Sequence, residues 1–261
     1  VLKENNNDID LSIDSLRIKG LAKATKKSSR EAKEGAVSFY YNENISVILK
    51  INSETDFSAK SDIFLDFVDQ LGNAALRLND PNLDLDKFLT SKENDKSISD
   101  LLVEMIAKIG ENIILNKLQV FNNKDFDINF YVHNPYRKNI GKIVSAVIYS
   151  CENNNTEVLN FSKNLCMHIA ATKPEAMDID QLPTDIVESE KNIQQELIKN
   201  SGKPSNIIDK ILEGKMKKFY SEVTLLNQSF VLNPDKTISE VIKDFNSSNN
   251  FDLKKYTLIS L

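Results

Sequence analysis

The sequence predicts an α+β protein, and two kinds of pattern carry that prediction. Short β-branched and aromatic runs bounded by polar turns alternate with longer segments whose apolar residues recur every three or four positions. The order of hairpin, loop and helix occurs twice, in residues 36–78 and again in residues 126–172. We therefore expect a core of two related α/β halves, each an antiparallel hairpin sheet packed with helices.

The first half begins with a predicted β-hairpin. Ala36–Tyr41 and Ile45–Ile51 carry β-branched and aromatic residues, and the polar residues Asn42–Asn44 favour a turn between them. A polar loop at Asn52–Lys60 leads to a predicted helix at Ile63–Leu78, whose apolar residues recur at helical spacing. This face of the helix is expected to be core.

The second half repeats this order. Phe126–Val132 and Gly141–Ser150 form the next predicted hairpin, and Val158–Thr172 forms the helix that follows it. Near the C-terminus, the composition of Glu222–Leu232 and of Tyr256–Leu261 predicts extended structure.

A protruding helical hairpin is predicted between these parts. Two amphipathic helices, Asp185–Asn200 and Ser205–Tyr220, flank the turn Ser201–Pro204, so they run antiparallel as a coiled coil. The apolar residues expected in its seam are Ile186, Ile193 and Leu197, facing Ile207, Ile211, Leu212 and Met216. Such an arm serves for dimerisation, for docking or as a structural projection, and the sequence leaves these alternatives open.

The residue pattern of the N-terminal segment predicts one isolated helix. Val1–Ala24 carries an apolar stripe, and Gly20 is placed to end the helix. Short isolated helices are marginal in water, and the chain opens with Val rather than Met. We therefore expect that Val1 is not the natural start and that this helix is the remnant of a small bundle. The basic connector Lys23–Gly35, with Arg30, is interpreted as solvated.

Composition narrows the class of protein. The 261 residues carry a formal charge of −5, which argues against general nucleic-acid affinity, and no membrane-spanning run or signal peptide is visible. The two cysteines, Cys151 and Cys166, follow no metal or redox spacing, which favours a reducing cytoplasm. The two histidines, His133 and His168, lie outside any metal motif, and phosphate-binding glycine motifs are absent from the sequence. We expect a binding protein without a cofactor or metal, not an enzyme.

The loop Ile51–Lys60 contains an unusual residue, Phe57, because loops are usually small and polar. Two interpretations compete. In the first, Ser53 or Thr55 caps a helix and Phe57 folds back against the core. In the second, Phe57 is an apolar wedge displayed to another protein, since an exposed ring at a loop tip needs a partner surface.

Three regions resemble one family, elongation factor Ts. Leu16–Gly35 resembles the signature that joins the family's N-terminal helical module to its core. Ile48–Lys60 resembles the family's Thr-Asp-Phe exchange loop, in its place after a hairpin. The third region consists of Ser201–Pro204, Glu213–Phe219 and Ser229–Thr237. Shorter pieces that fall in the expected order are Ile109–Asn112, Tyr131–His133 and His168–Pro174.

The resemblance implies a guanine-nucleotide exchange factor for elongation factor Tu in bacterial translation. Such a protein binds the nucleotide-free or GDP form of its partner and promotes GDP release. Phe57, with Thr55 and Asp56 beside it, would wedge between two helices of the partner close to its Mg²⁺ and nucleotide site. Ser58 stands where the family commonly has Val, and its hydroxyl weakens the apolar part of the loop.

Three further candidate contacts to elongation factor Tu follow from the resemblance. His133 aligns with a family histidine that contacts the partner, while Val231 and Leu232 match a family contact to its nucleotide-binding domain. The alternative for His133 is an ordinary loop histidine near a hairpin end, and for Val231 and Leu232 it is strand core. His168 lies in an apolar helix and is interpreted as structural. Direct binding to nucleic acid or membrane is not implied.

The resemblance also implies a division of the chain into four parts. Residues 1–30 would be the remnant of a ubiquitin-associated-like helical module with its linker, and residues 31–125 the N-half of the core with the exchange loop. Residues 126–176 and 226–261 would form the C-half of the core. Residues 177–225 would be the coiled-coil insertion.

A function of a different class stays open beside exchange. The helical hairpin Asp185–Tyr220 suits a scaffold or assembly protein that does not exchange nucleotide, and a homodimer through the same hairpin is a further candidate partner.

Overall fold

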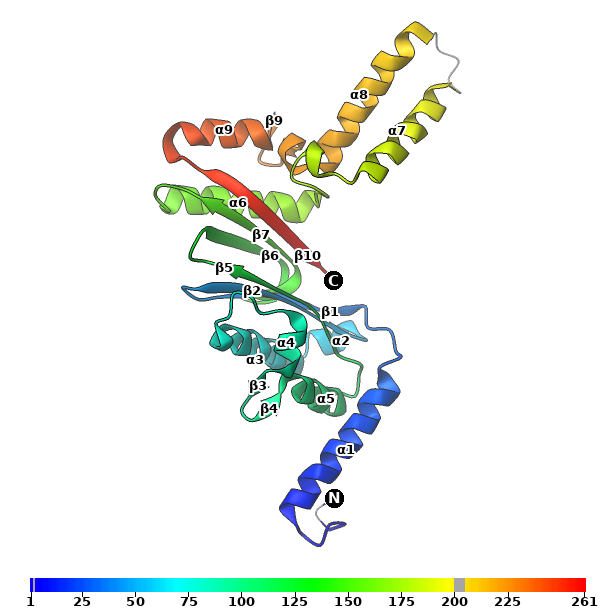
Figure 1. Ribbon diagram of the computed structural model, residues 1–261, viewed down its shortest axis with the longest axis vertical. Coiled ribbons are helices and arrows are strands. Elements are labelled where there is room, and N and C mark those ends of the chain that lie inside the picture. The colour runs from blue at the N-terminus through cyan, green and yellow to red at the C-terminus, as the bar shows by residue number, and fades with distance from the viewer. Residues whose placement is uncertain (2, 200–204) are drawn as a thin grey trace. The chain divides into compact units, whose positions relative to one another are not determined.

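The computed structural model describes residues 1, 3–199 and 205–261, which divide into two compact units. The first unit contains residues 1–144 and 259–261, and the second contains residues 145–258. Both combine helices with antiparallel strands (Figure 1), so the predicted α+β class is confirmed. The four-part division that the resemblance implies stays a prediction.

The sheet of the first unit is built around one long hairpin. As the sequence predicts, β1 (Glu34–Tyr41) pairs with β2 (Ile45–Ser53), and β2 pairs on its other side with β5 (Ile114–Asn122). The start of β7 (Ile140–Ser150) lies beside β1, and β6 (Asp127–Arg137) pairs with β7. Because β1 and β2 are buried along nearly their whole length, they form the centre of this sheet.

Three helices cover one face of that sheet (Figure 1). α3 (Asp62–Leu78) packs its apolar face on β1 and β2, and α4 (Leu85–Thr90) and α5 (Ile98–Ile109) extend the same apolar core. Between them lies a small hairpin of β3 (Lys92–Glu93) and β4 (Lys96–Ser97), which the sequence analysis does not predict.

The helix α1 (Ile9–Lys27) runs past the point where the sequence predicts its end. Gly20 does not stop it. A side chain at Gly20 would begin 3.6 Å from Val103 and 3.9 Å from Ala107, so the glycine lies where α1 packs on α5. The prediction was wrong because a glycine in mid-helix is tolerated where it allows close packing.

A polar cluster anchors α3 to the strands of the first unit. The Tyr40 hydroxyl donates to Asp69 at 2.7 Å, and Arg137 of β6 donates to Asp62, Asp66 and Asp69 at 2.7–3.1 Å. Burial, and after it the bond to Asp69, raise the pKa of Tyr40, so the phenol stays protonated. The ring lies against Gly72, where an added Cβ would come within 2.1 Å of it.

The second unit packs its helices around an aromatic cluster. α6 (Thr156–Thr172) and α9 (Ile238–Asn249) contribute Phe161 and Phe245, which stack at 4.0 Å, and Phe251 packs edge-on against both. β10 (Asp252–Ser260) lies next to β7 in the sheet order. The predicted helix after the second hairpin and the predicted last strand are thus both present.

The segment Glu222–Leu232 is mostly not extended, contrary to the prediction. α8 (Ser205–Val223) continues into it and is followed by the short helix η2 (Leu225–Asn227). Only the two residues of β8 (Ser229–Phe230) form a strand, paired with β9 (Asn233–Thr237). The β-branched residues at the end of α8 favoured a strand, but the bonds of Thr224 to the Tyr220 carbonyl close that helix instead. A further short helix, η1 (Ile179–Gln181), precedes α7.

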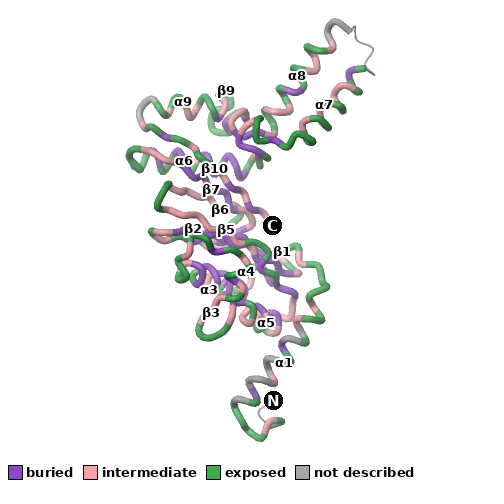
Figure 2. Tube along the Cα trace, viewed as in Figure 1, coloured by how far each residue is buried: buried purple, intermediate pink, exposed green. Residues whose placement is uncertain are grey.

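The two predicted arm helices are present as α7 (Thr184–Lys199) and α8, which lie side by side (Figure 1). The predicted turn Ser201–Pro204 and the side chain of Ile207 lie outside the described residues. The prediction of which α7 side chains are buried was shifted by one position. Ile186, Ile193 and Leu197 are exposed, whereas Ile198 is buried. Figure 2 shows both helices mostly in the colours of exposed and intermediate residues.

Among the described residues, none of the helices combines the length and the apolar character that a bilayer span requires.

We expect Gly72→Ala to lower the free energy of unfolding by about 1–3 kcal/mol, because the new methyl group would overpack the Tyr40 ring. The matched control is Gly214→Ala on α8, where nothing lies within 4 Å of the new Cβ. That change should be stabilising by roughly 0.5–1 kcal/mol through helix propensity. Urea unfolding of both variants checks the pair, and equal effects would contradict the packing at Tyr40.

Candidate functional site

The loop predicted to carry the function folds as a single helical turn. After β2, the Thr55 side chain accepts the Ser58 N–H at 3.2 Å and caps the four-residue helix α2 (Asp56–Ala59). The first interpretation of this loop was therefore right about the cap. It was wrong about Phe57, whose side chain is 85% exposed and does not fold back against the core.

The carboxylate of Glu111 fixes the start of this turn. One of its oxygens accepts the backbone N–H groups of Glu54 at 3.1 Å and of Thr55 at 3.0 Å. The other accepts the Thr55 hydroxyl at 2.7 Å. Glu54 and its neighbour Thr55, the N-cap, directly precede α2, so their N–H groups have no partner within the helix and this carboxylate satisfies groups that would otherwise face water.

A reciprocal set of bonds runs from the loop back to the same segment. Glu54 accepts the backbone N–H of Asn112 at 2.6 Å and pairs with Arg30 at 3.5 Å. The Asn112 side chain in turn donates to the Arg30 carbonyl at 2.7 Å. Arg30 was interpreted as part of a solvated connector, and its side chain is indeed exposed, but its carbonyl and its guanidinium also have partners here.

Charge and packing orient the two faces of α2. Lys60 donates to Asp56 at 2.8 Å, and this bond holds the pKa of the Asp56 carboxyl below its ordinary value. On the opposite side, Ala59 and Ser58 are buried. The Ser58 hydroxyl has no hydrogen-bond partner among the described residues, which agrees with the expectation that a hydroxyl weakens this apolar contact. The turn is therefore clamped on its inner side and presents Phe57 outward.

His133 lies within strand β6 and not in a loop, so the alternative of a loop histidine was wrong about its place. The ring is half-buried, and its Nδ1 lies 3.3 Å from the Tyr131 hydroxyl. This geometry leaves part of the ring accessible to solvent.

Val231 and Leu232 form the turn between β8 and β9 in the second unit. Their side chains are 44% and 57% exposed, so the alternative that they are ordinary strand core was wrong. Phe230, immediately before them, is buried and anchors the turn. Two apolar side chains displayed next to each other suit a contact with another protein.

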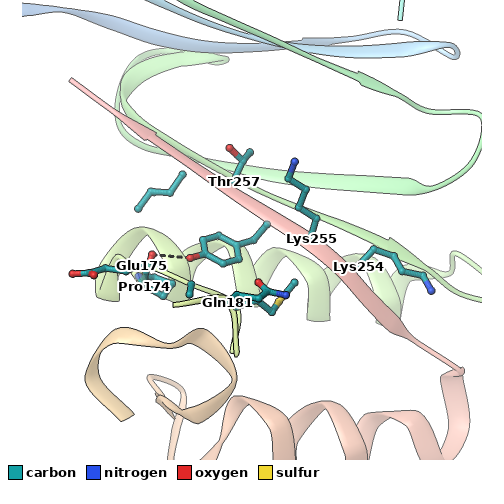
Figure 3. Close-up of a pocket in the computed structure, with 10 residues that line it drawn as sticks. Pro174, Glu175, Gln181, Lys254, Lys255 and Thr257 are labelled. Atoms are coloured by element: carbon teal, nitrogen blue, oxygen red, sulfur yellow. Dashed lines mark hydrogen bonds between the residues drawn. The ribbon is translucent and has the colours of Figure 1, made fainter. Parts of the chain in front are cut away.

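The second unit also contains a pocket of about 570 Å³ (Figure 3). It is lined on one side by Pro174 and Gln181 and on the other by β10. The Tyr256 hydroxyl donates to the Pro174 carbonyl at 2.7 Å and is therefore used structurally. In Figure 3, Lys255 projects from β10 on the side away from Pro174 and Gln181, and Lys254 pairs with Asp252. These cations do not converge on one ligand.

Comparison with known proteins supplies the family. The family model described as elongation factor TS matches residues 54–260. The elongation factor Ts of Allorhizobium ampelinum is 39% identical over 243 residues, covering 93% of this chain and 79% of that protein. The elongation factor Ts of Paracoccus denitrificans is 40% identical over 243 residues, covering 93% and 80%. The chain therefore belongs to the elongation factor Ts family of translation elongation factors.

Proposed function

We propose that this chain is a guanine-nucleotide exchange factor for elongation factor Tu and that Phe57 is the wedge that promotes GDP release. The observation that carries the proposal is an aromatic ring, 85% exposed, on a turn whose backbone is held by the Glu111 carboxylate. A ring that the chain fixes in place yet leaves in water is suited to burial in a partner.

The physical case for a wedge rests on burial energy. Burying a phenylalanine side chain is worth roughly 1.5–3 kcal/mol. That energy can offset the cost of separating two packed helices near the Mg²⁺ site of the partner. Because a bound Mg²⁺ carries much of the charge that holds the phosphates, a small displacement of its ligands loosens the nucleotide.

Thermodynamic linkage sets what such a factor can do. It must bind nucleotide-free elongation factor Tu more tightly than the GDP form, and by reciprocity GDP weakens its own binding by the same factor. The rate of exchange rises while the equilibrium between bound and free nucleotide stays the same.

No bond is made or broken, so the chain acts as a binding protein and not as an enzyme with catalytic residues. We place this activity in the cytoplasm, where translation occurs.

The other proposed contacts are His133 on β6 and the Val231–Leu232 turn. Each presents side-chain surface to solvent within its own unit. Thr55 and Asp56 support the wedge, the first as the cap of α2 and the second through its pair with Lys60.

A second candidate function is a scaffold that acts through α7 and α8 without exchanging nucleotide. The observation that favours it is the exposed apolar stripe Ile186, Ile193 and Leu197 on α7. If the chain is a scaffold, partner binding should depend on this stripe. If it is an exchange factor, partner binding should depend on Phe57. A homodimer through the arm would also use the stripe.

Phe57→Ala should slow GDP release from elongation factor Tu by about tenfold to a hundredfold, the factor that loss of roughly 1.5–3 kcal/mol of burial implies. Release of fluorescent GDP, followed by stopped flow, measures the effect. The free energy of unfolding should hardly change, because the ring is already exposed in the free chain. The matched control is Ile193→Ala, whose side chain is 50% exposed on α7. Loss of partner binding in the control alone would favour the scaffold.

Glu111→Ala should reduce exchange by about tenfold, because the turn loses hydrogen bonds to a charged acceptor worth roughly 1.5–3 kcal/mol. The control is Glu43→Ala, in the turn between β1 and β2 and at the opposite end of β2 from the Phe57 turn. This variant should promote exchange normally. If Glu111 acts by presenting Phe57, adding Glu111→Ala to Phe57→Ala should cost little more. Fully additive losses in this double-mutant cycle would show that the two residues act separately.

A further inference from the structure

A buried polar network lies beneath the Val231–Leu232 turn. His168 of α6 is fully buried, and its Nε2 lies 2.9 Å from Oε1 of Gln228. The other ring nitrogen, Nδ1, accepts the backbone N–H of Val231 at 3.3 Å. One imidazole therefore links the helix α6 to the turn that follows β8.

The tautomer of this ring follows from its neighbours. The side-chain nitrogen of Gln228 lies 2.7 Å from the Glu222 carbonyl, and because a carbonyl can only accept, this atom must be the amide NH₂. The amide oxygen therefore faces His168, and the Thr172 hydroxyl also donates to it at 2.8 Å. His168 must carry its proton on Nε2 to donate to that oxygen. Nδ1 is then free to accept the N–H of Val231.

The surroundings keep the ring neutral. Burial, opposed by the bond to Gln228, holds the pKa of His168 below its ordinary value. The Phe230 ring packs beside the imidazole, with 5.8 Å between ring centroids. A proton on Nδ1 would point at the Val231 N–H and remove the acceptor.

We propose that His168 is a positioning residue that fixes the Val231–Leu232 turn for contact with elongation factor Tu by accepting the Val231 N–H. This inference rests on the proposed function, in which the two exposed side chains meet the partner. His168 itself is buried and acts only through the turn.

The Val231–Leu232 turn needs an anchor such as His168, because the strands on either side of it are short. β8 is two residues long, and its pairing with β9 shifts register between Ser229 and Phe230. Isolated strand pairs are marginal in water even when they are longer. The buried Phe230 side chain anchors one end, and the bond from Val231 to the ring fixes the backbone at the turn itself.

A matched pair of variants separates the two ring nitrogens. In His168→Asn, the side-chain oxygen can take the place of Nδ1 and accept the Val231 N–H, while the bond to Gln228 is lost. In His168→Gln, the longer amide can reach Gln228, while the acceptor for Val231 is lost. Both variants remove the imidazole and each keeps one of its two bonds, so the bond to Val231 is reported by a difference at the Val231 amide itself, together with tighter partner binding by the variant that has lost the bond to Gln228.

The proposal expects His168→Asn to bind elongation factor Tu at least about fivefold more tightly than His168→Gln, the factor that one net hydrogen bond supplies. Amide hydrogen exchange at Val231 should be correspondingly slower in His168→Asn. Calorimetry and nuclear magnetic resonance measure the two effects. Equal exchange at the Val231 amide overturns the proposal, and so does equal affinity when the amide exchange differs.

The unaltered chain provides a test that does not depend on how the variants fold. Nitrogen chemical shifts of His168 at pH 7 should show the neutral tautomer with the proton on Nε2. A proton on Nδ1 overturns the proposal. If the unaltered chain does not bind elongation factor Tu, the proposed function fails, whereas the chemical shifts and the Val231 amide still decide the role of His168 in the turn.

The same ring predicts how stability depends on pH. Because the pKa of His168 is lower in the folded chain than the ordinary value of 6.5, the unfolded chain binds the proton more readily. The contribution of neutral His168 is fully present above pH 6.5 and is lost as the pH falls through its folded pKa. Urea unfolding between pH 7.5 and about 5.5 should show the unaltered chain losing stability relative to His168→Asn. Because both chains contain His133, any effect of that residue cancels in the comparison. Parallel curves of unfolding free energy against pH would contradict the prediction.

Discussion

The shape of the candidate site depends on carboxylates that reach between two distant segments. Glu111 lies 56 residues beyond Thr55 in the chain, yet it accepts both backbone N–H groups at the start of the turn. Glu54 returns a bond to Asn112, so each segment supplies an acceptor to the other. A helix of four residues would not nucleate alone, because a first turn fixes several dihedral angles for a single hydrogen bond. The display of Phe57 is therefore a tertiary property of the first unit.

The parts of the fold that the sequence predicted are those determined locally. The β-branched and aromatic composition of β1 and β2 and the cap at Thr55 depend on neighbours within a few positions. The bonds of Glu111 and Arg30 could not be predicted in this way, because a charged residue in a polar segment has the same local pattern whether it is solvated or paired. The short resemblance at Ile109–Asn112 was the one indication in the sequence that the segment containing Glu111 belongs to the candidate site.

The error on α7 and the missed partner of His168 have the same physical origin. On α7, the stripe with Ile193 and the stripe with Ile198 have equal helical spacing, and only the packing partner decides which one is buried. The buried stripe also carries Gln194, which donates to Glu190 at 2.7 Å, so polarity alone pointed to the wrong face. Likewise, His168 in an apolar helix was correctly expected to be structural, but its partner Val231 is 63 residues away. Sequence spacing carries no information about such a pairing.

The clamped turn has a consequence for the timing of the encounter with a partner. Because α2 is already formed, the conformational entropy of ordering this segment is lost during folding and not during association. Pre-organised surfaces change little on docking, so complex formation can proceed without a slow rearrangement of the loop. In the proposed complex, the lifetime is then governed by how well the Phe57 ring is seated in the partner. For the proposed exchange function that separation is an advantage, because residence time can be adjusted at one side chain without altering the speed of arrival.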